Sequence, residues 1–317
     1  MIEIKLVDKS SVDKEELLKL SIKQREEELE RDLNSEEIGK TEKLTEWLAT
    51  KYLTMNFQAF ENNKLVGWLG ICEAYPPTIL IWEYHPIITS SSKKNQIAKE
   101  LLLKCFDFAK KKDVTNTRTF IDVPEEKKKK FQELEHYFLQ NGMIQTHTVL
   151  CMENKLSVDK LKGTKLESDY HIETASSQTD ESLKDCYDKI FSKASDNFTN
   201  SLDKEERKYW NTPKSRNAID ASIVIKKGKE VVALILVADY GDYMELGPIG
   251  VVPDHRGRKL GKVLMEECLS RLIDMNKLNS YLEVDITNTP AINLYESYGF
   301  REVSKKHGFL FRIKTKN

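Results

Sequence analysis

The residues best suited to chemistry lie in one stretch, which runs from Glu245 to Lys262 (ELGPIGVVPDHRGRKLGK). The pattern predicts an apolar strand that continues through Pro253 into a glycine-containing turn, followed at once by a helix. Backbone N–H groups at a helix start, with the positive end of the helix dipole behind them, bind phosphate groups. Four basic side chains stand beside them: Arg256, Arg258, Lys259 and Lys262. The stretch therefore predicts an anion site, and a solvated basic helix face is the alternative.

This turn differs from the two common phosphate-binding loops. Gly257 and Gly261 enclose three residues, whereas a Walker A loop has four between its glycines. Val263 stands where that loop requires Ser or Thr, and the GxGxxG pattern is absent from the turn. Nucleotide binding of either common type is therefore not predicted.

Two motifs of this region resemble those of the GNAT acyltransferases. The family's first motif is V-x-P followed by [RQ]-x-x-G-x-[GA]; it reads here Val251-Val252-Pro253 and Arg256-Gly257-Arg258-Lys259-Leu260-Gly261, with Lys259 in place of the first glycine. The second motif, N-x-x-A-x-x-L-Y-x-x-x-G-F, is complete in Asn288, Ala291, Leu294, Tyr295, Gly299 and Phe300. The resemblance covers residues 170–317 strongly and residues 1–153 in outline.

The resemblance implies acetyl-CoA as the acyl donor; no metal is expected, because the histidines lack metal-site spacing. In the family, the coenzyme lies where two parallel strands separate, which would here be residues 245–252 and 280–286. The pantetheine arm would pair with the backbone of the first strand, and the pyrophosphate would lie on the basic turn. The implied cofactor-binding residues are Ile249, Gly250, Val251, Arg256, Gly257, Arg258, Lys259, Leu260, Gly261, Lys262 and Asn288.

The resemblance also implies two catalytic side chains. Tyr295 is the candidate general acid, because a phenol can protonate the departing thiolate; an aromatic packed at a helix end is the alternative. Glu245 is the candidate base, because an amine with a pKa near about 10 must lose a proton before it attacks. Other carboxylates compete for this role, and some family members use no single base: Asp239, Asp242, Glu283 and Asp285.

The order of predicted elements occurs twice along the chain. When Ala98 is aligned with Gly261, an offset of about 163, Cys105 falls on Cys268, and the helix ends at Gly142 and Gly299 also correspond. We therefore predict an α/β protein of two tandem GNAT folds, each a mixed, partly splayed sheet flanked by helices. The predicted domains are residues 1–153 and 170–317, joined by a polar linker at residues 154–169.

The predicted elements are mostly clear from periodicity. In the first half they are a strand at 2–6, a helix over 44–52, a hairpin around the turn 61–64, a strand at 79–88 and helices at 93–112 and 131–142. In the second half they are a strand near 171, helices through 209, a hairpin across 222–238, a strand at 243–252, a helix at 258–275, a strand at 280–286 and a helix that ends at 299.

The first copy lacks the residues that carry the motifs in the second. Its turn, Ser90-Ser91-Ser92-Lys93-Lys94, has no glycine, and Phe138 stands at the position of Tyr295. A phenylalanine cannot donate a proton, so we expect this copy to be catalytically inactive. The lysine runs at 110–112 and 127–130 are predicted to be solvated helix faces.

Composition limits the class of protein. The 317 residues carry 50 basic and 51 acidic side chains, a net charge of −1, which argues against binding nucleic acid by bulk charge. Five separated cysteines without a CxxC pair favour reduced thiols in the cytoplasm, with Cys268 as a core thiol. The six histidines have no zinc-site spacing. No stretch is long and apolar enough to predict a membrane partner.

We therefore expect an acetyl-CoA-dependent N-acetyltransferase whose second half transfers the acetyl group directly to a primary amine of a small molecule or peptide. A non-catalytic acyl-CoA-binding or sensing protein is the alternative, and an interaction scaffold that binds no nucleotide is another. The tandem arrangement is similar to that of the mycothiol synthases, but no residue specifies their acceptor. The sequence leaves the acceptor and the oligomeric state open.

Overall fold

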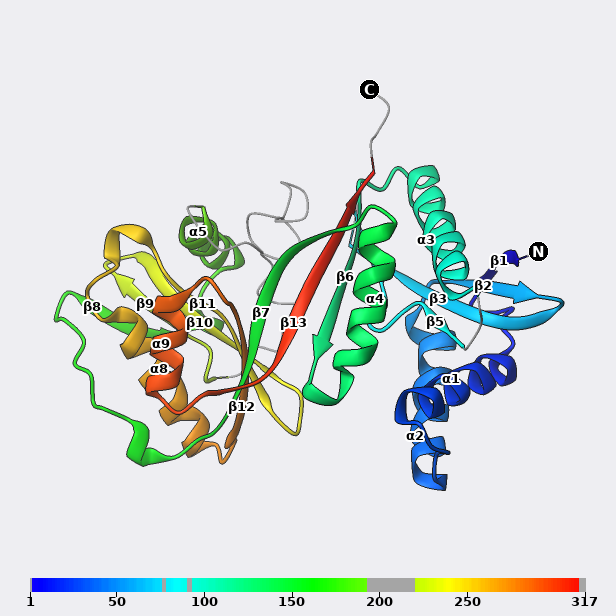
Figure 1. The fold of residues 1–317 in the computed structure, drawn as a ribbon. Coiled ribbons are helices and arrows are strands. Elements are labelled where there is room, and N and C mark those ends of the chain that lie inside the picture. Colours follow the sequence, from blue (N-terminus) through cyan, green and yellow to red (C-terminus); the bar gives the residue numbers. More distant parts are fainter. Residues whose placement is uncertain (1, 76–77, 90–92, 193–219, 314–317) are drawn as a thin grey trace. The chain divides into compact units, whose positions relative to one another are not determined.

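The computed structural model describes residues 2–75, 78–89, 93–192 and 220–313 (Figure 1). The chain divides into two compact units, one made of residues 1–146 and 307–317 and the other of residues 147–306. The predicted serine turn at 90–92 and the predicted helices beyond residue 192 lie outside the described residues. Each unit is described by itself below.

The first unit is a mixed sheet with helices on both faces. Its helices are α1 (Lys14–Leu29), α2 (Ser35–Trp47), α3 (Lys94–Lys111) and α4 (Lys128–Gln140). Its strands are β1 (Ile2–Asp8), β2 (Met55–Glu61), β3 (Lys64–Tyr75), β4 (Thr78–Ile81), β5 (Ile87–Ile88), β6 (Asn116–Val123) and the end of β13 (Arg301–Arg312). Strands β1 to β4 are antiparallel neighbours, whereas β4 and β6 are parallel.

The local sequence explains where these elements begin and end. Asn34 and Glu37 form a reciprocal capping box at the start of α2. Asn62 and Asn63 both have positive φ, 51° and 62°, which suits the predicted two-residue hairpin turn between β2 and β3. The predicted strand at 79–88 is instead split into β4 and β5, since Tyr84 adopts a φ of 61° between them.

Two apolar clusters hold the first unit together, one on each face of its sheet. One cluster includes Ile97 and Leu101 of α3 with Phe138 of α4, and the other includes Leu17 of α1 with Trp68 of β3. All five of these side chains are fully buried. The amphipathic periods predicted for α3 and α4 therefore face the core.

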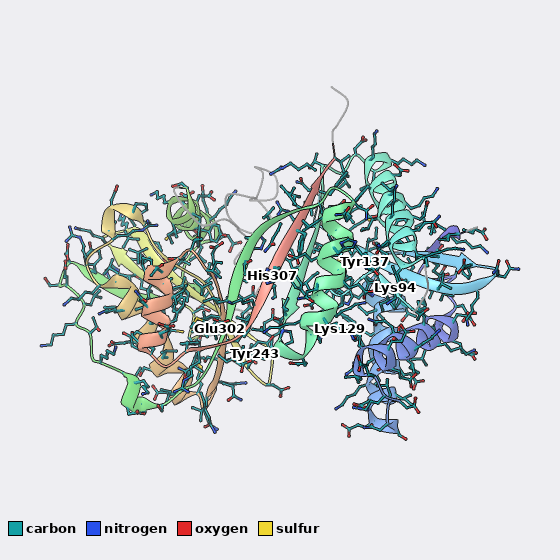
Figure 2. The ribbon with its side chains drawn as sticks, in the orientation of Figure 1. Lys94, Lys129, Tyr137, Tyr243, Glu302 and His307 are labelled. Carbon is teal, nitrogen blue, oxygen red and sulfur yellow. The ribbon has the colours of Figure 1, made fainter. Side chains whose placement is uncertain are left out.

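One lysine of the run at 127–130 is not solvated, contrary to the prediction. Lys130 is 7% exposed, and its ammonium lies 3.6 Å from both Glu28 and Glu133. Glu133 also accepts hydrogen bonds from Lys94 (3.0 Å) and Tyr137 (2.8 Å), whose side chains are labelled in Figure 2. A buried ammonium needs such paired carboxylates, because an unpaired charge in the interior is strongly unfavourable.

The second unit repeats the mixed sheet. Its helices are α5 (Asp180–Phe191), α8 (Leu260–Asp274) and α9 (Thr289–Ser297). Its strands are most of β7 (Ile144–Lys155), then β8 (Tyr170–Thr174), β9 (Ile223–Lys227), β10 (Glu230–Asp239), β11 (Met244–Val251), β12 (Asn279–Asp285) and the start of β13. Strands β11 and β12 are parallel, and their neighbours β10 and β7 run antiparallel to them.

The sheet of the second unit is also covered on both faces. Helices α8 and α9 pack on one face through residues such as Leu264 and Tyr295, and α5 packs on the other through Leu183 and Ile190. Cys268 lies in the α8 core at 0% exposure, which confirms the prediction of a core thiol; all five cysteines are buried and unbridged. The mixed, helix-flanked α/β fold was thus predicted correctly.

The two units differ from the predicted domains at their edges. Strand β7 enters the second unit after Thr146, and β13 returns to the first unit at His307. The reason is that the end of β13 completes the core of the first unit, where Phe309 is 1% exposed and Phe311 stacks on Phe106 with 3.9 Å between ring centroids. The predicted linker is also shorter, because residues 154–155 belong to β7.

The ends of α4 and α9 support the repeat. The N–H groups of Met143 and Phe300 bond to the carbonyls of Phe138 and Tyr295, at 3.0 and 3.2 Å, so Phe138 occupies the place of Tyr295. Each helix is followed by a glycine with positive φ. At the other helix pair the caps Lys93 and Lys259 are 166 residues apart, three more than the predicted offset. None of the helices in the described residues is long and apolar enough to cross a membrane.

Candidate active site

Strands β11 and β12 separate shortly after they begin. They pair only at Met244 with Ser280 and at Glu245 with Tyr281. Strand β11 nevertheless stays paired with β10 on its other side as far as Val251, with a register shift that accommodates Gly247 and Pro248. Beyond Glu245, one edge of β11 is therefore open toward β12, as predicted from the splayed sheet.

The pairing with β10 fixes which backbone groups face this opening. The N–H of Val252 bonds to the carbonyl of Val232 (2.9 Å), and successive residues of a strand point their polar groups to opposite sides. Ile249 and Val251 therefore point theirs toward β12, whereas Gly250 points its groups toward β10. The carbonyl of Val251 accepts a hydrogen bond from Nε of Arg256 (3.0 Å), which leaves the N–H groups of Ile249 and Val251 for a strand-like ligand.

Gly250 has a packing role that the sequence did not indicate. A Cβ at this position would lie 2.3 Å from Cγ2 of Ile190, so only glycine allows α5 to pack this closely on β11. Arg256 strengthens the same contact, because its Nη2 donates to the carbonyl of Ile190 (3.2 Å). Gly250 and Arg256 thus hold the strand, the turn and α5 together.

The basic turn leads into α8 through a left-handed residue. Lys259 has a φ of 62°, and its carbonyl accepts the first helical bonds, from the N–H groups of Lys262 and Val263. The N–H groups of Leu260 and Gly261 consequently have no partner within the helix. They point along the helix axis at the positive end of the dipole, where an anion is favoured.

A cavity of about 450 Å³ opens at this helix start. None of the described residues that line it is acidic, and four of them are cationic, namely Lys162, Arg256, Lys259 and Lys262. It is also lined by Val251, His255, Gly257, Leu260, Gly261, Pro290, Asn293, Leu294 and Ser297. Free N–H groups and concentrated positive charge fit the phosphates of coenzyme A.

The cavity brings together most of the predicted cofactor residues, but not all of them. Ile249 and Gly250 lie earlier on β11 and do not line the cavity, and Arg258 pairs with Glu167 at 3.3 Å instead. Asn288 caps α9 by accepting a bond from the N–H of Ala291 (3.3 Å), so its contact with pantetheine stays a prediction.

Sequence reasoning missed one face of α9 and one residue of the linker. The cavity-lining residues of α9 are spaced as a single helix face: Pro290, Asn293, Leu294 and Ser297. Their spacing was visible in the sequence, although only Leu294 belongs to the motif. Lys162 carried no signal, because it stands in a polar stretch without periodicity.

We expect Lys259→Gly to stabilise the protein by about 1 kcal/mol, because a side chain in the left-handed region costs about 1–2 kcal/mol and glycine avoids this. Thermal unfolding measures the gain. Lys259→Ala is the matched control: it removes the same charge but keeps the Cβ, so it should bring no comparable stabilisation. Equal stabilities of the two variants would show that the left-handed conformation at residue 259 does not destabilise the protein.

Tyr295 lies in the core between α9 and the sheet. Its side chain is 6% exposed, and its ring packs edge-on to Phe300 with 6.2 Å between centroids. Burial raises the pKa of its phenol well above the ordinary value, so the hydroxyl keeps its proton at neutral pH. A raised pKa also makes the phenol a weaker acid, and Tyr295 is not among the residues that line the cavity, so its role as general acid stays a prediction.

Most of the rival carboxylates have structural partners. Asp239 accepts a bond from the N–H of Gly241 (2.7 Å) and pairs with Lys277 (3.0 Å). Asp285 accepts bonds from Thr287, at 2.9 Å from its N–H and 2.6 Å from its hydroxyl. Glu283 binds the Tyr281 hydroxyl (2.8 Å) and Lys306. Glu245 is half-buried at the last paired position before β11 and β12 separate; it too has an interaction of its own, and its role as the base stays a prediction.

Aromatic rings and carboxylates share the sheet face that carries Glu245. Glu245, Tyr281 and Glu153 are cross-strand neighbours on β11, β12 and β7 and therefore lie on one face. The ring of Tyr243, labelled in Figure 2, lies 5.7 Å from that of Tyr281 and stacks on Tyr240 at 5.2 Å. Carboxylates beside aromatic faces attract ammonium groups.

Residues 183–300, which include the splayed strands and the basic turn, match the model of the acetyltransferase (GNAT) family. This stretch, which makes up most of the second unit, is similar to the GNAT acetyltransferases. Two solved GNAT structures cover the chain end to end. One is a GCN5-related N-acetyltransferase from Sphaerobacter thermophilus (TM-score 0.63, 11% identity, 99% of this chain and 96% of that one). The other is a tandem GNAT protein from the clavulanic acid biosynthesis pathway (TM-score 0.57, 12% identity, 100% of both). At these identities the likeness shows a shared GNAT fold.

Curated relatives match the chain over a shorter stretch. Over 68 residues the chain is 37% identical to the ribosomal protein bS18-alanine N-acetyltransferase of Salmonella typhimurium and 35% identical to that of Escherichia coli. The stretch is 22% of this chain and 46% of each relative, so the chain spans about half the length of the curated relatives it matches.

Proposed function

We propose that this protein is an acetyl-CoA-dependent N-acetyltransferase that acts on a primary amine and that its second unit carries the reaction. The observation that supports this most strongly is the cationic cavity at the start of α8, which adjoins the open edge of β11. Bound there, acetyl-CoA supplies an activated acetyl group. The N–H groups of Ile249 and Val251 orient the pantetheine arm, and the turn at 256–262 binds the pyrophosphate.

The remaining roles concern protons. Glu245, directly or through water, accepts the proton that the attacking amine loses, and the neighbouring Tyr243 and Tyr281 hold the ammonium form of the acceptor before it reacts. Tyr295 donates its proton to the departing thiolate. The amine attacks directly while both substrates are bound, and strand N–H groups polarise the thioester carbonyl.

Calorimetric titration of acetyl-CoA into the full chain tests this function. We expect one site per chain, because the first unit has Phe138 at the acid position and no glycine in its turn. Two sites would contradict a degenerate first unit, and absence of binding would contradict the enzyme. Release of CoA when mixed amines are supplied then separates an acetyltransferase from a protein that only binds acyl-CoA.

Gly261→Phe is expected to weaken this binding at least tenfold (about 1.4 kcal/mol) without unfolding the protein. A Cβ at Gly261 would meet only Leu294, at an ordinary 3.6 Å, so the fold itself tolerates a side chain whereas a bound pyrophosphate would not. Gly39→Phe is the control, because Gly39 also lies in a helix and has no atom within 4 Å of its Cβ position. Unchanged affinity in Gly261→Phe would contradict the proposal that this turn binds the pyrophosphate.

A further inference from the structure

Residues 161–169, which we name the strap, form no helix or strand but are bound firmly to α8. The N–H and hydroxyl of Thr164 donate to the two carboxylate oxygens of Glu266, at 2.6 and 2.7 Å. Leu161 and Leu166 pack against the apolar core beneath α8. Two hydrogen bonds to one carboxylate and two apolar anchors hold this short segment in place.

Glu266 is a built anchor for the strap. It is 8% exposed on the buried side of α8, and the hydroxyl of Tyr298 donates a third hydrogen bond to it (2.7 Å). Burial acts to raise the pKa of Glu266, but the bonds from Thr164 and Tyr298 outweigh burial and place the pKa below its ordinary value. The anchor is therefore a carboxylate at neutral pH.

The same anchor fixes the position of Lys162. Its ammonium lies over the ring of Tyr298, 5.1 Å from the centroid, and the residue lines the cavity together with Lys259 and Lys262. The one glutamate of the strap, Glu167, pairs with Arg258 at 3.3 Å and does not line the cavity. The strap thus presents a cation, and no acid, to the cavity.

We propose that the strap is part of the coenzyme site and that Lys162 binds a phosphate group of coenzyme A. This inference rests on the proposed function. Thr164 and Glu266 are positioning residues, because they act on the ligand only through Lys162. The segment that joins β7 to β8 therefore contributes to affinity as well as to connection.

The test compares Lys162→Ala with Lys165→Ala, an exposed lysine of the same strap that does not line the cavity. We expect Lys162→Ala to weaken acetyl-CoA binding roughly tenfold at low salt, with a smaller loss at high salt. In Lys162→Ala, kcat should stay unchanged while KM for acetyl-CoA rises. Lys162→Arg should restore most of the affinity. Equal affinities of Lys162→Ala and Lys165→Ala would overturn the proposal.

Two further ligands sharpen the result. Acetyl-dephospho-CoA lacks the 3′-phosphate: if the effect of Lys162→Ala vanishes with it, Lys162 binds the 3′-phosphate, and if the effect persists, Lys162 binds the pyrophosphate. Inorganic pyrophosphate separates failure of the proposed function from failure of the proposal about the strap. A chain that binds pyrophosphate through Lys162 but not acetyl-CoA would retain the anion site and refute the enzyme. A chain that binds acetyl-CoA equally well without Lys162 would refute the strap alone.

Discussion

Replacing Tyr295 with phenylalanine is expected to lower kcat by about 10²- to 10⁴-fold and to leave the affinity for acetyl-CoA unchanged. The change removes only a hydroxyl, which makes no hydrogen bond to the described residues, so the packing against Phe300 is kept. Because burial raises the pKa of this phenol, the wild-type group stays protonated below its ordinary pKa of about 10, and its titration should not limit the rate there.

Steady-state rates and thermal unfolding of the same samples measure this effect. Tyr137→Phe is the control from the first unit: Tyr137 is similarly buried, and although its hydroxyl donates to Glu133, its loss should leave kcat unchanged. Full turnover by Tyr295→Phe would contradict the assignment of the reaction to the second unit. A loss of rate that only follows a loss of folded protein would give Tyr295 a packing role.

Changing Phe309 to alanine is expected to lower the free energy of unfolding of the first unit by about 3–5 kcal/mol, although the residue lies near the end of the chain. Phe309 is 1% exposed and lies 5.3 Å from the ring of Phe138, measured between centroids. Deletion of residues 307–317 should go further and prevent this unit from folding, because the Phe311 stack is lost as well.

Denaturant unfolding followed by probes in each unit measures this effect. Val303→Ala is the control on the same strand, since Val303 is 49% exposed and its removal leaves no cavity. We expect that variant to unfold like the wild type. If Phe309→Ala destabilised only residues 147–306, the assignment of the last strand to the first unit would be wrong.

The sequence predicted the parts of the fold that have strong local patterns. Helices α3 and α8 were predicted within two residues of their ends, and the hairpin of β9 and β10 was also found. Strands β7 and β13 were not predicted, because they alternate weakly and follow helix ends that resemble domain ends. Each of these two strands contributes residues to both units. This arrangement depends on the pairing of distant segments, which local patterns do not predict.

The candidate site follows the same division. The basic turn carries its chemistry in adjacent residues, so its cationic lining could be read directly from the chain. The left-handed conformation of Lys259 was not predicted, because lysine itself gives no sign of positive φ; the glycine that the family has at this position was the available signal. The role of Lys162 was not predicted for another reason. Its position depends on Glu266, 104 residues away, and on Tyr298, which stands at a variable position of the second motif.

The return of β13 to the first unit has a consequence for biosynthesis. Domains generally fold in the order in which the ribosome makes them. Here the core of the first unit includes Phe309 and Ile313, which leave the ribosome after every residue of the second unit. The half of the protein that is translated first is therefore the half that finishes folding last. Until β13 has emerged, strand β6 of the first unit lacks its neighbour, and this open edge needs protection from other chains.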